Sequence, residues 1–254
     1  MKPLTAARDL QRRRARLRTG LFLAEGIRCV EELFASPLRV RSVILSPGLR
    51  ASDRGAKLDS LARDLASARE FDLSQVSDRE FAEVADTETP QGIIAIAEQP
   101  ERAFESIDVT GTVLLLDGIQ DPGNVGTILR TAQAFGVAAT VALPGTVDLW
   151  NPKVVRSAMG ALFTHRAFHA GVTETLEYLR SIAMPIWATS AAGDPIGRRS
   201  GGEGVAIVVG NEGSGVSSEI AGAADRTVAI PIRGVESLNV AVATGILLYA
   251  VTTA

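Results

Sequence analysis

Residues 205–210 read VAIVVG, residues 211–220 read NEGSGVSSEI, and residues 226–251 read RTVAIPIRGVESLNVAVATGILLYAV. VAIVVG and RTVAIPI are short apolar runs with β-branched residues, and each leads into a loop of small and polar residues. Such runs are typical of buried strands in a parallel sheet. Ligands of parallel sheets bind beyond the carboxyl ends of the strands. The sequence therefore predicts that the chemistry of this chain lies in the loops 210–215 and 231–239.

The rest of the chain alternates between apolar runs of strand length and segments with helical periodicity, which predicts an α/β fold. Residues 98–108 are polar and lack a core pattern. We therefore expect a small N-terminal α/β domain over residues 1–98, a linker over 99–110, and a second α/β domain with a parallel sheet over 111–254. The expected strands are 39–45, 70–73, 92–97, 113–116, 137–143, 162–169 and 185–189. The expected helices are 4–17, 21–34 after a strand-like entry, 58–68, 78–84, 124–135, 151–159, 173–182 and 238–251.

Charge is unevenly distributed, although the formal net charge of the 254 residues is only -3. The first 28 residues carry eight basic residues, against Asp9 and Glu25 as the acidic ones. A helix over residues 4–17 would place Arg12, Arg13 and Arg16 on one broad face. That face is either a solvated helix surface or a surface that contacts phosphate, since arginine offers a bidentate fork to phosphate.

Several classes of protein are disfavoured by the composition. The single cysteine, Cys29, cannot form an internal disulfide, so we expect a buried structural thiol and a reducing, cytoplasmic compartment. The N-terminus lacks the apolar core of a secretory signal, and no apolar run approaches the roughly 20 residues of a membrane span. His165 and His169 have no cysteine nearby and no H-E-x-x-H pattern exists, so we expect no metal site.

Two loops combine glycines with polar residues. Residues 210–215 read GNEGSG, which differs from the G-x-G-x-x-G of dinucleotide-binding sites, and the G-x-S-x-G of hydrolases is absent. Glycines there allow either close approach of a ligand or a plain strand-to-helix turn. After a turn at 121–123, we expect a helix with Asn124 and Arg130 near one face. Either this is a capped amphipathic helix with Arg130 on its surface, or the two residues bracket a phosphate or ribose of RNA. Ser237 is a good N-cap for the apolar final helix.

Three segments in this order resemble the three signature motifs of the SpoU (TrmH-type) RNA 2′-O-ribose methyltransferases, which belong to the SPOUT superfamily. They are DGIQDPGNVGTILRTAQAFG at 117–136, GNEGSGV at 210–216 and IPIRGVESLNVAVATGILLY at 230–249. The resemblance covers residues 113–254 closely. LFLAEGIRCVEELFAS at 21–36 is similar to the start of the substrate-binding domain that often precedes the catalytic domain in this family. The fold of that domain resembles a small ribosomal RNA-binding protein.

The resemblance implies a SPOUT catalytic domain with a parallel sheet and a C-terminal trefoil knot, preceded by an RNA-binding domain. It implies transfer of a methyl group from S-adenosylmethionine to a ribose 2′-hydroxyl, with 23S (large-subunit) ribosomal RNA as the substrate class. Transfer RNA is the alternative substrate, and a non-catalytic RNA-binding or ribosome-assembly protein is the alternative function. The family also implies a homodimer in which the apolar final helix packs partly against a second subunit.

Residue roles are implied by the matched motif positions. Arg130 matches the proposed catalytic residue, which helps to remove the proton from the ribose hydroxyl. Because an arginine side chain stays protonated across ordinary pH, phosphate positioning and transition-state stabilisation are at least equally good roles for Arg130. The resemblance assigns Asn124, Glu212, Ser237 and Asn239 to the active site and Gly210, Ile230, Leu238, Ala188, Thr189 and Ser190 to the cofactor pocket, and together with the charge pattern it assigns Arg12, Arg13, Arg16 and Arg18 to RNA binding.

Overall fold

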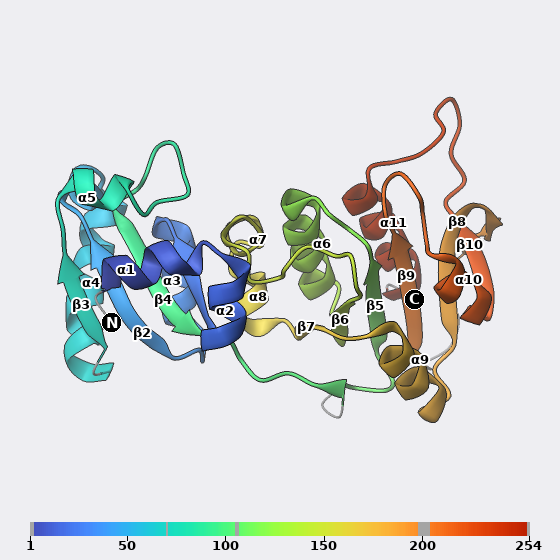
Figure 1. The fold of residues 1–254 in the computed structure, drawn as a ribbon. Coiled ribbons are helices and arrows are strands. Elements are labelled where there is room, and N and C mark those ends of the chain that lie inside the picture. The colour runs from blue at the N-terminus through green and yellow to red at the C-terminus, as the bar shows by residue number, and fades with distance from the viewer. Residues whose placement is uncertain (1–2, 70, 105–106, 198–203, 253–254) are drawn as a thin grey trace. The chain divides into compact units, whose positions relative to one another are not determined.

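A computed structural model divides the chain into two compact units, each with its own sheet. The structure describes residues 3–69, 71–104, 107–197 and 204–252. Unit 1 comprises residues 1–101 and 150–164, and unit 2 comprises residues 102–149 and 165–254. Figure 1 shows the helices and strands of both units, with labels on those other than β1 and η1. Helices and strands alternate in both, so the predicted α/β class is confirmed.

Unit 1 is built on a four-stranded sheet in the order β1-β4-β2-β3. β4 pairs antiparallel with β1 and β2, whereas β2 pairs parallel with β3. The strands are β1 (Leu21–Glu25), β2 (Val40–Leu45), β3 (Asp72–Gln75) and β4 (Ile93–Glu98). The helices are α1 (Pro3–Leu10), α2 (Arg13–Thr19), α3 (Ile27–Ala35), the 3₁₀ helix η1 (Pro47–Ala51), α4 (Asp53–Arg69), α5 (Asp78–Ala82), α7 (Pro152–Ser157) and α8 (Ala161–Thr164).

The helices α1, α2 and α5 supply one apolar cluster of unit 1. Leu10 of α1, Ala15 of α2 and Phe81 of α5 pack together with strand residues that include Leu23. α5 begins where the sequence predicts, because the Ser77 hydroxyl accepts a hydrogen bond from the backbone N–H of Glu80. Residues with small or apolar side chains on these helices thus hold them to the sheet.

Residues 150–164 belong to unit 1, although in the sequence they lie between two strands of unit 2. The ring of Phe22, which is fully buried in β1, lies 4.5 Å from that of Trp150 and 5.7 Å from that of Phe163. Alternate strand residues point to opposite faces, so Phe22 and its partners lie across the sheet from Leu23. The sequence placed this segment in the domain 111–254, and the boundaries drawn there stay a prediction.

The helix predicted over residues 4–17 is instead two helices, α1 and α2, with a break at Gln11 and Arg12. Arg16 is only 2% exposed, and its Nη1 atom donates hydrogen bonds to the carbonyls of Leu10 (2.7 Å) and Gln11 (2.9 Å). Carbonyls at the end of a helix lack hydrogen-bond donors within the helix, and the Arg16 side chain supplies a donor to these two carbonyls. The prediction that Arg16 contacts RNA is therefore wrong, because its guanidinium is buried in this structural role.

The strand predicted over residues 162–169 is correct only in its last part. Residues Ala161–Thr164 form α8, and β7 covers Ala167–His169. Leu162 and Phe163 are buried in a helical turn of unit 1. A short apolar run does not distinguish a strand from a buried helical turn, which explains the error.

Unit 2 is built on a six-stranded sheet in the order β10-β8-β9-β5-β6-β7, and every pairing in it is parallel. This is the parallel sheet predicted for the second domain. The strands are β5 (Thr112–Asp117), β6 (Ala139–Ala142), β7 (Ala167–His169), β8 (Ile186–Pro195), β9 (Val205–Gly210) and β10 (Arg226–Ala229). The helices are α6 (Pro122–Ala134), α9 (Val172–Ser181), α10 (Ser218–Ala223) and α11 (Val240–Thr252).

Helices cover the sheet of unit 2 in two groups. Leu179 of α9 and Ile220 of α10 pack with Val113 and Leu115 of β5 in one buried cluster. α6 and α11 pack against each other, and α11 also contacts β9. Across the described ranges, no helix is both long and apolar enough to cross a membrane.

The final helix α11 is not covered on all sides within one chain. Leu247 and Leu248 are buried, but Val242, Ile246 and Tyr249 are 54%, 40% and 52% exposed. The exposed residues are spaced four and three positions apart, which places them on one face of the helix. α11 therefore carries an apolar face that the chain itself leaves open to solvent.

Candidate active site

The loops singled out from the sequence begin at the carboxyl ends of neighbouring parallel strands. β5 and β9 are adjacent, and their register pairs Asp117 with Gly210, the last residue of each strand. β8 and β10 continue the sheet beyond β9. The carboxyl ends of parallel strands lie at one edge of a sheet, so the loops that follow them meet there, as predicted.

Asn211 fixes the turn after β9. Asn211 and Gly215 exchange backbone hydrogen bonds of 3.0 and 2.9 Å. The side-chain carbonyl of Asn211 accepts hydrogen bonds from the backbone N–H groups of Gly213 (2.9 Å) and Ser214 (3.1 Å). Its amide donates to the carbonyl of Gly118 at 2.9 Å. The loop after β9 is thereby joined to the loop after β5.

Gly210 lies where the backbone leaves no room for a side chain. A Cβ atom at this position would come within 2.2 Å of the carbonyl carbon of Gly215 and of the backbone nitrogen of Val216. Neither of these atoms belongs to a flexible side chain, so any larger residue must displace the turn itself. Glycine is therefore a geometric requirement of the turn that Asn211 closes.

Three side chains from separate loops form a directed chain of hydrogen bonds. The amide of Asn239 donates to the side-chain carbonyl of Asn124 at 3.0 Å, and the amide of Asn124 donates to the carboxylate of Glu212 at 2.8 Å. The direction is set at α11, where the side-chain carbonyl of Asn239 accepts from the backbone N–H groups of Ala241 (3.0 Å) and Val242 (3.3 Å). A helix cap thus orients two amides and, through them, one carboxylate.

The sequence predicted Ser237 as the cap of the final helix, but the cap is Asn239. α11 begins at Val240, directly after Asn239, and the Asn239 carbonyl satisfies two of its first free N–H groups. Serine and asparagine are about equally good caps, so residue type alone could not select between them. Ser237 is exposed and lines the cavity described next.

A cavity of about 220 Å³ lies at the same edge of the sheet, and Glu212 forms part of its wall. Of the six residues predicted to bind the cofactor, Ala188 is 2% exposed within β8 and does not line this cavity. The other five all line it: Gly210, Ile230, Leu238, Thr189 and Ser190. Further apolar walls come from Val209, Val228, Ile232 and Leu247, and a second carboxylate comes from Glu236.

Arg130 is on α6 with Asn124, but the structure does not join it to the other candidates. Its side chain is exposed, and it makes no hydrogen bond or ion pair with another residue in the described part of the chain. It is also absent from the walls of the cavity. Arg130 is therefore a free cation on the helix that begins at the site.

Two residues that shape the site were not among the candidates. Asp117 is 7% exposed, and its carboxylate accepts a hydrogen bond from the backbone N–H of Ser217 at 2.6 Å. The Thr146 hydroxyl donates to the carbonyl of Leu116 at 2.7 Å and accepts from the N–H of Gly118 at 3.1 Å. A carboxylate at the end of an apolar strand is a signal that could have identified Asp117. The sequence around Thr146 carries no such signal.

The histidines stand apart from this site. Burial lowers the pKa of His165 to about 4, together with a smaller contribution from the positive charges of Arg102 and Arg166. The His165 Nε2 atom lies 2.8 Å from the hydroxyl of Thr140, so the neutral ring has a structural hydrogen bond in the interior. Over the residues that the structure describes, no three His, Cys, Asp or Glu side chains are grouped so as to hold a metal ion.

The two hydrogen-bonding roles of Asn239 are separable by substitution. Asn239→Asp keeps the side-chain oxygens that cap α11 but removes the amide that donates to Asn124. We expect stability within about 0.5 kcal/mol of the original protein, with catalytic turnover reduced about tenfold to 100-fold, because residues that orient a site contribute at this level. Asn239→Ala should in addition lose about 1 kcal/mol of stability through the missing cap. Chemical denaturation measures the effect on stability, and a turnover assay measures the effect on catalysis. Equal turnover of Asn239→Asp and the original protein would contradict a catalytic role for the chain of hydrogen bonds.

Comparison with known proteins adds two family matches. Residues 111–249 match the SpoU rRNA Methylase family, and residues 4–95 match the MRM3-like substrate binding domain. The first match contains Asn124, Glu212 and Asn239, and therefore the whole directed chain of hydrogen bonds. The second match lies within unit 1.

Relatives are similar over nearly the whole chain. The 23S rRNA (guanosine(2553)-2′-O)-methyltransferase RlmP of Bacillus subtilis is 34% identical over 95% of this chain and 92% of its own length. An AdoMet-bound rRNA methyltransferase from Sinorhizobium meliloti superposes with a TM-score of 0.84 at 26% identity, over 98% of this chain and 94% of the other. The SpoU methyltransferase AviRb from Streptomyces viridochromogenes, in complex with AdoMet, gives a TM-score of 0.83 at 26% identity, over 98% and 96%.

Proposed function

Because this chain belongs to the SpoU rRNA Methylase family, we propose that it transfers a methyl group from S-adenosylmethionine to a ribose 2′-hydroxyl of 23S, large-subunit ribosomal RNA. One observation carries the proposal. Glu212 is both a wall of the cavity and the end of the hydrogen-bonded chain from Asn239 through Asn124. A carboxylate held in this way beside a ligand cavity suits the orientation of a hydroxyl group that receives a methyl group.

The walls of the cavity fit the cofactor. S-adenosylmethionine, when bound, supplies a methyl group carried on a positively charged sulfur. The apolar side chains of Ile230 and Leu238 suit the adenine ring, and the hydroxyls of Thr189 and Ser190 suit its polar groups. Gly210 keeps the backbone close to the ligand, where a Cβ atom would have to displace the turn.

In the proposed mechanism each polar residue acts on a group of the substrate. Glu212 accepts a hydrogen bond from the ribose hydroxyl and then takes its proton as the oxygen gains the methyl group. Asn124 and Asn239 keep the carboxylate in place. Ser237, exposed at the rim of the cavity, donates a hydrogen bond to the RNA. Arg130 binds a phosphate of the RNA and stabilises the negative charge that develops on the attacking oxygen, since a guanidinium stays protonated and makes a poor base.

Unit 1 is proposed to bind the RNA. Residues 4–95 match a substrate binding domain, and the side chains of Arg12, Arg13 and Arg18 are exposed and form no ion pair in the described part of the chain. These arginines take the role predicted from the sequence, without Arg16. We propose that the activity lies in the cytoplasm, because the proposed substrate is ribosomal RNA and the one cysteine is a buried free thiol.

The apolar face of α11 is proposed to pair with a second copy of the chain, as the family implies, and the loop 230–239 with α11 to form the trefoil knot. Ile246→Glu introduces a charge into that face, so we expect a monomer in light scattering where the original protein is a dimer. Leu61→Glu on α4 is a matched control, because Leu61 is 42% exposed and Ile246 is 40% exposed. A monomeric original protein, or a dimer unaffected by Ile246→Glu, would refute this pairing.

The function is tested by incubating the protein with methyl-labelled S-adenosylmethionine and unmodified 23S rRNA or total transfer RNA. We expect label in the 23S rRNA, and mass spectrometry of the digested RNA should locate it on a ribose 2′-oxygen. Label in transfer RNA alone would mean that the substrate class is wrong. Binding of both cofactor and 23S rRNA without any methyl transfer would favour a non-catalytic RNA-binding protein.

A further inference from the structure

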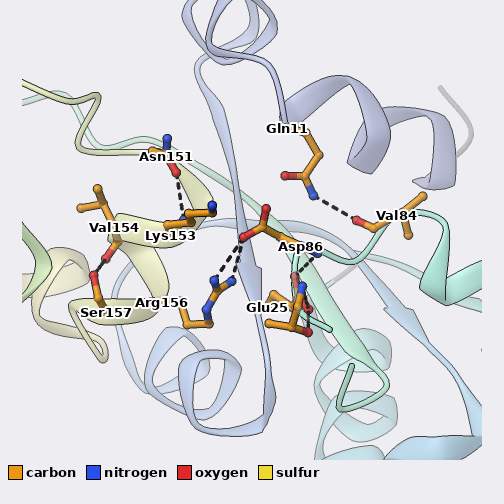
Figure 2. Close-up of polar contacts among 10 residues, drawn as sticks. Gln11, Glu25, Val84, Asp86, Asn151, Lys153, Val154, Arg156 and Ser157 are labelled. Atoms are coloured by element: carbon orange, nitrogen blue, oxygen red, sulfur yellow. Dashed lines mark hydrogen bonds and ion pairs between the residues drawn. The ribbon is translucent and has the colours of Figure 1, made fainter. Parts of the chain in front are cut away.

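Helix α7 comes from the methylase half of the sequence but presents its charged side chains on unit 1. Val154 and Val155 are buried, whereas Lys153 is exposed and Arg156 is partly buried. The two guanidinium nitrogens Nη1 and Nη2 of Arg156 each donate to Oδ2 of Asp86 at 3.1 Å. Figure 2 shows Lys153 and Arg156 on the same short helix, with Arg156 directed at Asp86.

Asp86 is itself held by a buried carboxylate. Glu25 is 5% exposed, and its Oε2 atom accepts a hydrogen bond from the backbone N–H of Asp86 at 2.7 Å. Its Oε1 atom accepts hydrogen bonds from the backbone N–H of Thr87 at 3.3 Å and from the Thr87 hydroxyl. The segment that receives Arg156 is therefore fixed to β1, and α7 is fixed to that segment (Figure 2).

The same segment also holds the junction between α1 and α2. The Gln11 side chain donates a hydrogen bond to the carbonyl of Val84 at 3.0 Å, two residues before Asp86. Arg12, Arg13 and Arg14 follow Gln11 directly, and all three are exposed. Two direct contacts, Gln11 to Val84 and Asp86 to Arg156, thus connect the arginines and Lys153 through one ordered segment.

Two of the carboxylates near these contacts are already paired with arginines. Glu83 pairs with Arg8 at 3.1 Å, and Asp86 pairs with Arg156. Lys153, by contrast, has no carboxylate partner among the described residues, and the same holds for the three arginines after Gln11. The other acidic residues around these contacts are Asp9, Glu25 and Glu88, and the four cations without a carboxylate partner outnumber them.

We infer that Lys153 joins Arg12, Arg13 and Arg14 in one surface that binds the sugar-phosphate backbone of the substrate RNA. We call these four residues the basic strip. The inference rests on the proposed function, and it extends the RNA-binding surface beyond residues 4–95 into the part of the chain that matches the methylase family. Unpaired cations on a fixed scaffold favour a polyanion, since phosphates release their counterions on binding.

The test measures the affinity of the full-length protein for 23S rRNA by filter binding at a series of potassium chloride concentrations. We expect Lys153→Ala to weaken binding about threefold to tenfold near 0.1 M salt and to reduce the slope of log K against log salt by about 0.7 to 0.9, the contribution of one phosphate contact. Arg13→Ala should reduce the slope by a similar amount. Lys57→Ala is the matched control, because Lys57 is an exposed lysine of α4 in the same unit.

A slope for Lys153→Ala equal to that of the original protein, with Arg13→Ala lowering it, would remove Lys153 from the surface and overturn the inference. An equal loss of RNA affinity in Lys153→Ala and Lys57→Ala would also overturn the inference, because the loss would then follow from the lower net charge of the protein and not from the position of Lys153. Failure of the original protein to bind 23S rRNA at any salt concentration would instead contradict the proposed function. Calorimetry with S-adenosylmethionine should give the same affinity for all of these variants, since none of the substituted residues lines the cavity.

Discussion

Gly210→Ala should reduce the affinity for S-adenosylmethionine about 100-fold or more, which corresponds to about 2.7 kcal/mol of binding free energy. The added Cβ atom would lie 2.2 Å from backbone atoms of Gly215 and Val216, so the turn at the end of β9 has to move. That turn forms part of the cavity wall. Isothermal titration calorimetry with S-adenosylmethionine measures the loss directly.

Two further variants show whether the effect is local. Gly222→Ala is the control, because a Cβ atom at Gly222 has no neighbour within 4 Å, and it should bind the cofactor normally. Leu238→Arg places a bulky charge in the cavity wall from a half-buried loop position, and it should lose binding without loss of folding. Full affinity in both Gly210→Ala and Leu238→Arg would mean that this cavity does not bind the cofactor.

Arg130→Ala should lower the rate of methyl transfer about 100-fold or more and leave cofactor affinity unchanged. Loss of a group that stabilises developing charge in a transition state has an effect of this size. The affinity is expected to persist because Arg130 does not line the cavity and, among the described residues, its side chain forms no hydrogen bond or ion pair with those that do. Single-turnover methylation of 23S rRNA, with calorimetry alongside, separates the rate from the binding.

The control for Arg130 is a second exposed arginine on a helix of unit 2. Arg180→Ala on α9 removes the same charge from a position outside the cavity, and it should leave the rate within about twofold. Arg130→Lys should recover part of the rate, since it restores the charge but not the bidentate fork. A rate for Arg130→Ala close to that of the original protein would show that Arg130 has no part in catalysis.

The parallel sheet and the edge that carries the site could be predicted from sequence because both depend on local pattern. VAIVVG is apolar throughout and ends in glycine, so its strand ends at residue 210 whatever surrounds it. The helix predicted over residues 124–135 is present as α6, which begins two residues earlier than predicted because Asp121 caps it and Pro122 occupies its first position. The polar candidates other than Arg130 then came together because the sheet brings the loops after its strands to one edge.

The errors arose where packing in the folded chain, rather than the local sequence pattern, decides the outcome. Arg16 has the sequence surroundings of its exposed neighbours, and only the break between α1 and α2 turns it inward to the carbonyls of Leu10 and Gln11. Similarly, Leu162 and Phe163 read as a strand because the packing of Phe163 on Phe22, far away in the sequence, is invisible in a local pattern. The choice of Asn239 over Ser237 as the cap depends on where α11 starts, and Asn239 is also held by Asn124, which lies 115 residues away in the sequence.

The passage of residues 150–164 into unit 1 limits how this protein can exchange its parts with relatives. The backbone passes from one unit to the other after residues 101, 149 and 164. A chimera joined only at residue 101 would replace the sheet of unit 1 by that of a relative but keep Trp150 and Phe163. The rings of these two residues pack on Phe22, which belongs to the replaced sheet. Recombination at a single junction would therefore mismatch an interior, so the two sequence segments that build unit 1 have to be exchanged together.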